Sequence, residues 1–258
     1  MRKKILISAL LVVAAIVAIW FFLFRDDAPP PPDAQSAAAV AEAAQTTTTV
    51  PSTTSGDSAT TTQVVATTTE VETGIEGFWV VDTAIGSFED FSSTYVGFRI
   101  EEELAQGIGK TTAVGRTPVV SGTLEFSSSE LLSAEIIADL SQITTDRSWR
   151  DDNVYDALDA GNHPNAVFSL VGPITLDDPE TEGIEHPISA TGELTIKGVT
   201  QEVSVELTAQ RIGQIITVTG QFPMVFSDFG VEVPTAPIVV SVEDNGLIEV
   251  QLFLTPAS

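Results

Sequence analysis

The sequence predicts an all-β domain of about eight to ten antiparallel strands, folded as a sandwich or a barrel. From Phe78 onward, apolar and polar residues alternate with a period of two in one segment after another, as in strands with one buried and one solvated face. These segments are short and are separated by Gly, Pro, Asn and Asp, which is typical of strands joined by tight turns. The chain has no Cys, so the domain relies on its core rather than on disulfides or Cys-bound metal.

Two N-terminal segments precede this domain, which we place at residues 75–258. Residues 1–25 join the basic stretch Arg2 to Lys4 to an apolar run from Ile5 to Phe24, and about 20 helical residues span roughly 30 Å of bilayer. A cleaved signal peptide is the alternative, but its apolar region is usually shorter and ends at small residues. We expect an uncleaved single-pass membrane anchor, and the positive-inside rule places the C-terminal domain outside the cytoplasm.

The second segment, residues 26–74, is rich in Pro, Ala and Thr. It contains Pro29 to Pro32 and several Thr tracts, and it has little apolar content to offset the entropy lost on ordering. We therefore expect a disordered linker, either unmodified or carrying O-linked sugars.

The strands of the domain are expected near residues 96–100, 120–126, 134–140, 166–170, 194–196, 203–207, 216–226, 238–242 and 248–254. Two hairpins are predicted among them, one turning at Gly198 and one at Asn245-Gly246, since Gly and Asn-Gly favour tight β-turns. Residues 148–160 interrupt the pattern, because Val154, Tyr155 and Leu158 have helical spacing. We expect a short helix there.

Composition excludes several classes of function. The formal net charge is −25, which repels nucleic acid because binding of phosphate depends on Lys and Arg. Only His163 and His186 are present, each before a Pro, and no Gly-x-Ser-x-Gly motif occurs, so a Ser-His-Asp triad is not indicated. We expect no catalysis, no metal site and no cofactor.

Three stretches resemble a known family. The run SWRDDNVYDALDAGNHPNAVFSL (148–170), the run GELTIKGVTQEVSVEL (192–207) and FSDFG (226–230) resemble, in this order, the signatures of the YceI-like proteins, over about residues 77–255. The resemblance implies a lipocalin-like, up-and-down antiparallel barrel of about eight strands, outside the cytoplasm, which in some members encloses a polyisoprenoid lipid. The chain departs from the family at Asn153 and at Glu101 to Glu103, where the family often has His. The chain therefore lacks the imidazoles for a head-group contact at these two positions.

The candidate site is the interior of this barrel. An eight-stranded barrel is either filled by its own side chains or holds one slender ligand; periodicity alone favours a filled core, and the resemblance favours a cavity. The predicted lumen residues are all apolar: Phe98, Ile100, Phe126, Ile136, Phe168, Ile196, Val205, Phe222 and Phe226.

Arg150 and Asp151 are the polar pair to follow. Arg150 lies either at the barrel mouth, against a ligand head group, or in a structural bond that ties the helix to a carboxylate or a strand carbonyl, and Asp151 is expected to cap the helix.

These observations predict a membrane-tethered, extracytoplasmic barrel that binds an isoprenoid-like or fatty molecule without catalysis. The alternative is a solid-core structural or interaction module of the cell envelope whose acidic surface meets a protein partner. An open cavity supports the first function, and a lumen filled with aromatic rings supports the second.

Overall fold

A computed structural model describes residues 28–48, 74–104, 109–233, 239–242 and 244–257. The expected membrane anchor and residues 49–73 of the expected linker lie outside these ranges. No helix within them is long and apolar enough to cross a membrane.

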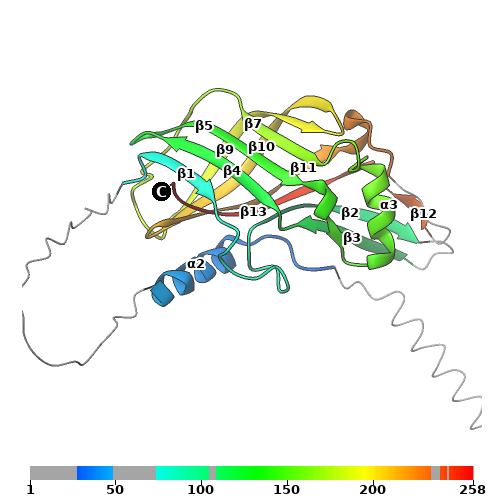
Figure 1. Cartoon of the computed structure of the whole chain (residues 1–258), viewed down its shortest axis with the longest axis horizontal. Helices are drawn as coiled ribbons and strands as arrows, with labels where there is room; N and C mark the ends of the chain where they lie inside the picture. The colour runs from blue at the N-terminus through cyan, green and yellow to red at the C-terminus, as the bar shows by residue number, and fades with distance from the viewer. Residues whose placement is uncertain (1–27, 49–73, 105–108, 234–238, 243, 258) are drawn as a thin grey trace, which may run out of the picture.

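Within the described part of the chain, eight antiparallel strands close into a barrel (Figure 1). They are β1 (Gly77–Val81), β4 (Val120–Phe126), β5 (Glu130–Asp139), β7 (Asn165–Leu170), β9 (Glu185–Ile196), β10 (Val199–Ile212), β11 (Ile215–Val225) and β13 (Asn245–Pro256). Each strand pairs with the next in this order, and β13 pairs with β1 through Val81 and Leu254, which closes the ring. The prediction of a barrel is thereby confirmed.

The last strand, β13, has two partners along one of its edges. Residues 254–256 pair with β1, whereas residues 247–251 pair with β2 (Tyr95–Leu104). The sheet continues from β2 to β3 (Gly109–Thr117) and β6 (Thr144–Thr145), while β12 (Val239–Val242) pairs with β2 and β8 (Ile174–Thr175) pairs with β5. The sheet thus continues beyond the closed ring through β2, β3 and β6.

One predicted hairpin is confirmed and the other is wrong. Strands β9 and β10 turn at Lys197-Gly198, with Gly198 at φ +75°. Asn245-Gly246, however, forms the start of β13, where the two residues pair with Val225 and Met224 of β11. Strand β12 does not pair with β13; it pairs with β2. The backbone N–H and C=O groups of β12 and β13 bond to β2 and β11, which are distant in the sequence. The local preference of Asn-Gly for a tight turn is therefore overridden.

The predicted helical interruption is present as a short helical segment. It comprises η3 (Ser148–Arg150) and α3 (Asp151–Ala157). Two further single turns are η2 (Leu140–Gln142) and η4 (Phe226–Phe229); η4 ends at Gly230, whose φ of +65° is the left-handed conformation that Gly adopts readily. Helix α3 and η4 lie at the same end of the barrel, because Lys197 Nζ donates to the carbonyls of both Ala157 and Gly230.

The prediction of a disordered linker is wrong for residues 28–48. Helix α2 (Ala34–Thr48) packs against the outside of the barrel, where Ala37, Ala38 and Ala41 are buried. They contact a separate apolar cluster formed by Ile85, Ile212, Ile215 and Phe253. The Ala-rich composition favours a helix, and a stripe of small side chains at spacings of three and four lets its backbone approach the strands closely.

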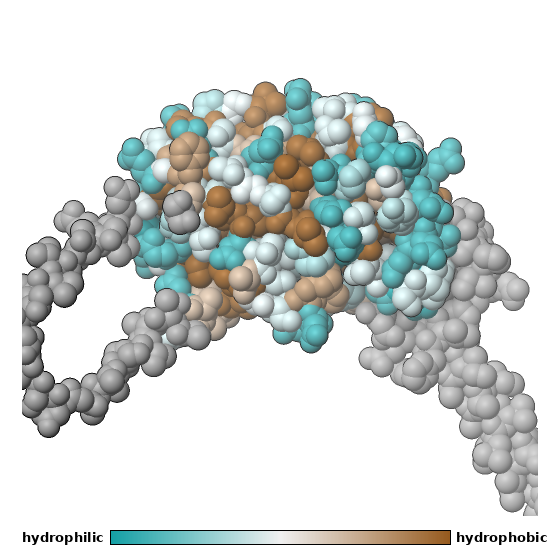
Figure 2. All heavy atoms as spheres, in the orientation of Figure 1, coloured by the Kyte–Doolittle hydropathy of each residue, from teal (hydrophilic) through white to brown (hydrophobic). Residues whose placement is uncertain are grey.

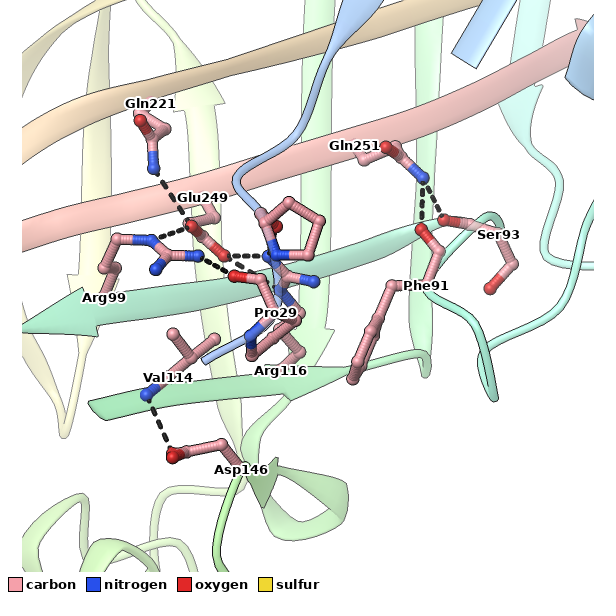
Figure 3. A network of polar contacts seen from close by, with 11 residues as sticks. Pro29, Phe91, Ser93, Arg99, Val114, Arg116, Asp146, Gln221, Glu249 and Gln251 are labelled. Atoms are coloured by element: carbon pink, nitrogen blue, oxygen red, sulfur yellow. Dashed lines mark hydrogen bonds and ion pairs between the residues drawn. The ribbon is translucent and has the colours of Figure 1, made fainter. Parts of the chain in front are cut away.

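The segment before α2 is also fixed to the barrel. Arg99 and Arg116 donate hydrogen bonds to the backbone carbonyls of Pro29 and Pro30 (Figure 3). At the start of the helix, the backbone N–H of Ser36 donates to the carboxylate of Asp33. The Ser36 hydrogen bonds lower the pKa of the Asp33 carboxyl. Residues 28–48 are therefore part of the folded domain.

Candidate ligand-binding cavity

The barrel interior contains a cavity of about 400 Å³. Its wall comes from every strand of the barrel except β1, and most of the lining side chains are apolar. Strand register explains this, since Val205, Leu207 and Ala209 of β10 lie on the inner face opposite Ala190, Ile188 and His186 of β9. A volume of this size falls within the range of small-molecule pockets.

Glycines on neighbouring strands make room for two of the predicted lumen rings. A Cβ on Gly192 would clash with the ring of Phe168, and one on Gly115 would clash with the ring of Phe98. Glycine at both positions therefore lets each ring lie against the neighbouring strand. The Phe168 ring lines the cavity, whereas the Phe98 ring does not.

The structure divides the nine predicted lumen residues into two groups. The first group lines the cavity: Phe126, Ile136, Phe168, Val205 and Phe222. The second group lies in the apolar core without lining the cavity: Phe98, Ile100, Ile196 and Phe226. Phe98 of β2 and Phe226 of η4 meet edge to face with ring centroids 6.4 Å apart.

Polar residues line the cavity at only one of its ends. They are Thr175, Asp177, His186, Ser189, Gln210 and Arg211. Backbone bonds hold this end together, from Leu176 N to Ser129 O (2.8 Å) and from Gly183 N to Arg211 O (2.9 Å). The cavity is therefore an apolar chamber with a polar end formed by residues 175–189 and the end of β10.

Arg211 is neutralised at this polar end. Its guanidinium donates from Nη1 to Glu180 Oε2 at 2.7 Å and from Nε to the carbonyl of Gly213 at 3.1 Å. The other carboxylate oxygen of Glu180 accepts a hydrogen bond from the backbone N–H of Ile75 at 3.1 Å. These bonds join the loop between β8 and β9 to the barrel wall.

Arg150 has the structural role rather than the head-group role. Its side chain is buried and donates from Nη2 to Glu102 Oε2 at 2.6 Å and from Nη1 to Asp146 Oδ1 at 2.9 Å. Burial raises the pKa of the Glu102 carboxyl, and the nearby Arg150 charge opposes this rise. Arg150 does not line the cavity; it ties the start of α3 to β2.

Asp151 does not cap the helix, contrary to the prediction. Its Oδ1 accepts hydrogen bonds from the backbone N–H (2.8 Å) and the hydroxyl (2.7 Å) of Thr145. The side chain is drawn back toward β6, and Arg150 occupies the cap position without a side-chain bond. The pair Arg150 and Asp151 therefore fixes the loop between β6 and α3.

Two residues at the polar end, His186 and Arg211, were not among the predicted site residues. The signal that could have found His186 is the period-two series that runs through Ile188, Ala190, Leu194 and Ile196, because it extends backward to His186 on the same face. Among the residues that the structure describes, no three His, Asp or Glu side chains converge as metal ligands would.

The closed antiparallel barrel and its apolar cavity define a lipocalin-like β-barrel. The family model of the YceI-like domain matches residues 63–254, which is more than half of the chain. The chain belongs to the YceI-like family. Among curated proteins, none matches it.

Solved structures with the same fold include a polyisoprenoid-binding domain from Saccharophagus degradans implicated in plant cell wall breakdown. It has a TM-score of 0.52 and 14% identity, and the match covers 70% of this chain and 99% of that one. BcnA of Burkholderia cenocepacia is also similar, with a TM-score of 0.47 and 21% identity over 68% of this chain and 99% of that one. At this identity the first likeness establishes the fold.

Proposed function

We propose that the barrel binds a long apolar molecule, isoprenoid-like or fatty, inside its cavity and releases it chemically unchanged. The observation that carries this proposal is the cavity of about 400 Å³ with a mainly apolar wall. Moving a hydrocarbon chain from water into such a wall gains about 25 cal/mol for each Å² of apolar surface removed from water. The similar domain from Saccharophagus degradans is described as polyisoprenoid-binding, which supports the same class of ligand.

On the face seen in Figure 2, hydrophobic residues gather near the middle and polar ones surround them. The interior is where apolar atoms form one continuous wall. A solid-core interaction module would instead need Phe126, Phe168 and Phe222 to fill the axis, but these side chains line an open space.

The proposal includes tethering of the barrel to a membrane. It is supported by the apolar run from Ile5 to Phe24 behind a basic N-terminus. Only residues 25–28 separate this run from Pro29, whose carbonyl accepts a hydrogen bond from Arg99 of β2. The barrel is then held outside the cytoplasm and close to the bilayer, where a lipid can pass between membrane and cavity over a short distance.

Two matched variants test ligand binding. Ala190 lines the cavity, whereas its neighbour Thr191 points outward and is exposed. Native mass spectrometry of full-length protein from its own host should reveal co-purified lipid in the wild type and in Thr191→Phe. In Ala190→Phe, whose ring occupies the lumen, the lipid should be lost. A wild-type protein that carries no lipid and gains no thermal stability from isoprenoids contradicts the proposal.

Membrane fractionation tests the tether separately. The full chain should remain with membranes after alkaline extraction, and protease added outside intact cells should reach the barrel. Recovery of the uncleaved chain in the soluble fraction contradicts the tether and leaves the binding proposal standing.

A further inference from the structure

The polar end of the cavity has a specific chemistry. Of the cavity-lining residues, Asp177, His186 and Arg211 are the ones with ionisable side chains, and all three lie at this end. The opposite part of the wall, around Phe168, Leu194 and Phe222, is apolar. Such a cavity matches a linear amphiphile with one polar end and a hydrocarbon chain.

His186 and Gln210 are the side chains at this end with a buried atom that has no hydrogen-bond partner among the described residues, Nε2 and Oε1 respectively. Of these two residues, His186 is the one with an ionisable side chain. It pairs in register with Ala209 and therefore lies on the inner face of β9. Its Nε2 atom is buried and has no hydrogen-bond partner among the described residues. A buried polar atom without a partner has lost its hydrogen bonds to water without replacement, so a ligand atom that bonds to Nε2 would remove this cost.

The charges at this end disfavour an anionic head group. The Arg211 guanidinium is already bonded to Glu180 and to the Gly213 carbonyl. Beyond Glu180, the surrounding loop adds exposed carboxylates at Asp177, Asp178, Glu182 and Glu185. A ligand with a carboxylate or phosphate head group would be repelled by these negative charges, whereas an uncharged head group would not.

We infer that the ligand carries an uncharged head group, of the hydroxyl type, that hydrogen-bonds to His186 Nε2 while its apolar chain runs along the cavity toward Phe222. This inference rests on the proposed function and specifies its ligand class. A hydroxyl suits the site because it donates or accepts, and so it bonds to either tautomer of the imidazole.

Three probes that share one isoprenoid chain separate head-group recognition from chain binding: farnesol, farnesyl phosphate and farnesene. Each is added to the full-length protein in detergent, and binding is read as displacement of a fluorescent apolar dye. One neutral hydrogen bond contributes about 0.5–1.5 kcal/mol, so farnesol should bind roughly 2- to 12-fold more tightly than farnesene. Farnesyl phosphate should bind more weakly than farnesol, and the difference should shrink at high salt.

Variants of the two histidines supply the matched controls. His186→Leu should erase the preference for farnesol over farnesene while leaving farnesene binding intact, and His186→Gln should retain part of the preference. His163 lies in an exposed loop outside the cavity, so His163→Leu should bind all three probes as the wild type does. Thermal melts of each variant show whether the fold is kept.

The outcomes separate this inference from the proposed function. If all three probes bind the wild type equally, or if His186→Leu keeps the farnesol preference, the head-group inference is wrong and lipid binding stands. Tightest binding of farnesyl phosphate also overturns it. If none of the probes binds, the proposed function and the inference fail together.

Discussion

Arg116 and Glu249 form a buried ion pair on the outer face of the barrel. The Arg116 guanidinium donates to Glu249 Oε2 from Nε at 2.8 Å and from Nη2 at 2.6 Å, and the two side chains are 1% and 0% exposed. The other oxygen, Oε1, accepts from Arg99 Nε at 2.7 Å and from Gln221 Nε2 at 3.0 Å (Figure 3). The Arg116 guanidinium also lies over the rings of Phe91 and Tyr95, 4.7 and 4.3 Å from their centroids.

Glu249→Gln should therefore destabilise the domain strongly. The substitution leaves the charges of Arg99 and Arg116 without their carboxylate, and removing one partner of a buried ion pair typically costs about 3–5 kcal/mol. Urea denaturation of the two proteins measures the difference in unfolding free energy.

The exposed pair of Lys110 and Glu101, with side chains 63% and 58% exposed, is the control for this measurement. Glu101→Gln should change stability by less than about 1 kcal/mol, because water screens the exposed pair. Equal small losses in both variants would mean that the buried pair contributes no more than a surface pair.

The contact between α2 and the barrel can be tested at neighbouring alanines. Ala41 is fully buried against the strands, whereas Ala39 on the same helix is exposed. Ala41→Glu should cost about 2 kcal/mol, because it places an unpaired carboxylate in an apolar interface. This corresponds to a fall in melting temperature of roughly 4–8 °C for a domain of this size.

Ala39→Glu should change stability by less than about 0.5 kcal/mol. In Ala41→Glu, but not in Ala39→Glu, proteases should cut residues 34–48 readily. If the two variants melt at the same temperature, α2 does not contribute to the stability of the barrel.

The buried Glu102 carboxyl predicts a particular dependence of stability on pH. Burial raises its pKa in the folded protein above the ordinary value of 4.5, and the Arg150 charge opposes this only in part. Between the unfolded and folded pKa values the folded state binds more protons, so the contribution of Glu102 to stability falls as pH rises through that window. The unfolding free energy of the wild type minus that of Glu102→Gln should be largest below pH 4.5 and should decrease as the pH is raised.

Urea denaturation across a pH series measures this difference. Glu101→Gln, at the exposed neighbouring position, corrects for the loss of one charge from an acidic surface. A difference that grows with pH would mean that the ion pair with Arg150 outweighs burial.

The barrel could be predicted from the sequence because its strands carry a strict inside–outside alternation. Local signals failed where a distant partner decides the structure. Asn245-Gly246 is a strong local signal for a turn, but both residues form strand because they pair with β11. Residues 28–48 contain few large apolar residues, but the alanines of α2 pack against Ile212 and Phe253 on the barrel.

The site was predicted in part for a similar reason. Periodicity identifies inward residues such as Phe168 and Phe222, but it does not show that Phe98 and Phe226 pack together beyond the open space. The partners of Arg150 lie on β2 and in the loop before η3, 48 and four positions away along the chain. Those contacts form only when the chain has folded, and the spacing of residues along the sequence does not predict them.

The docking of α2 changes what the Thr-rich segment connects. The chain contacts the barrel at Gln45 of α2, which donates to the carbonyl of Ile212, and again at Ile75, which donates its N–H to Glu180. Residues 49–73 therefore join two points of one domain instead of separating the membrane from it. A protease that nicks this segment would leave two fragments held by non-covalent contacts, so the proposed membrane tether would keep the barrel attached after the cut.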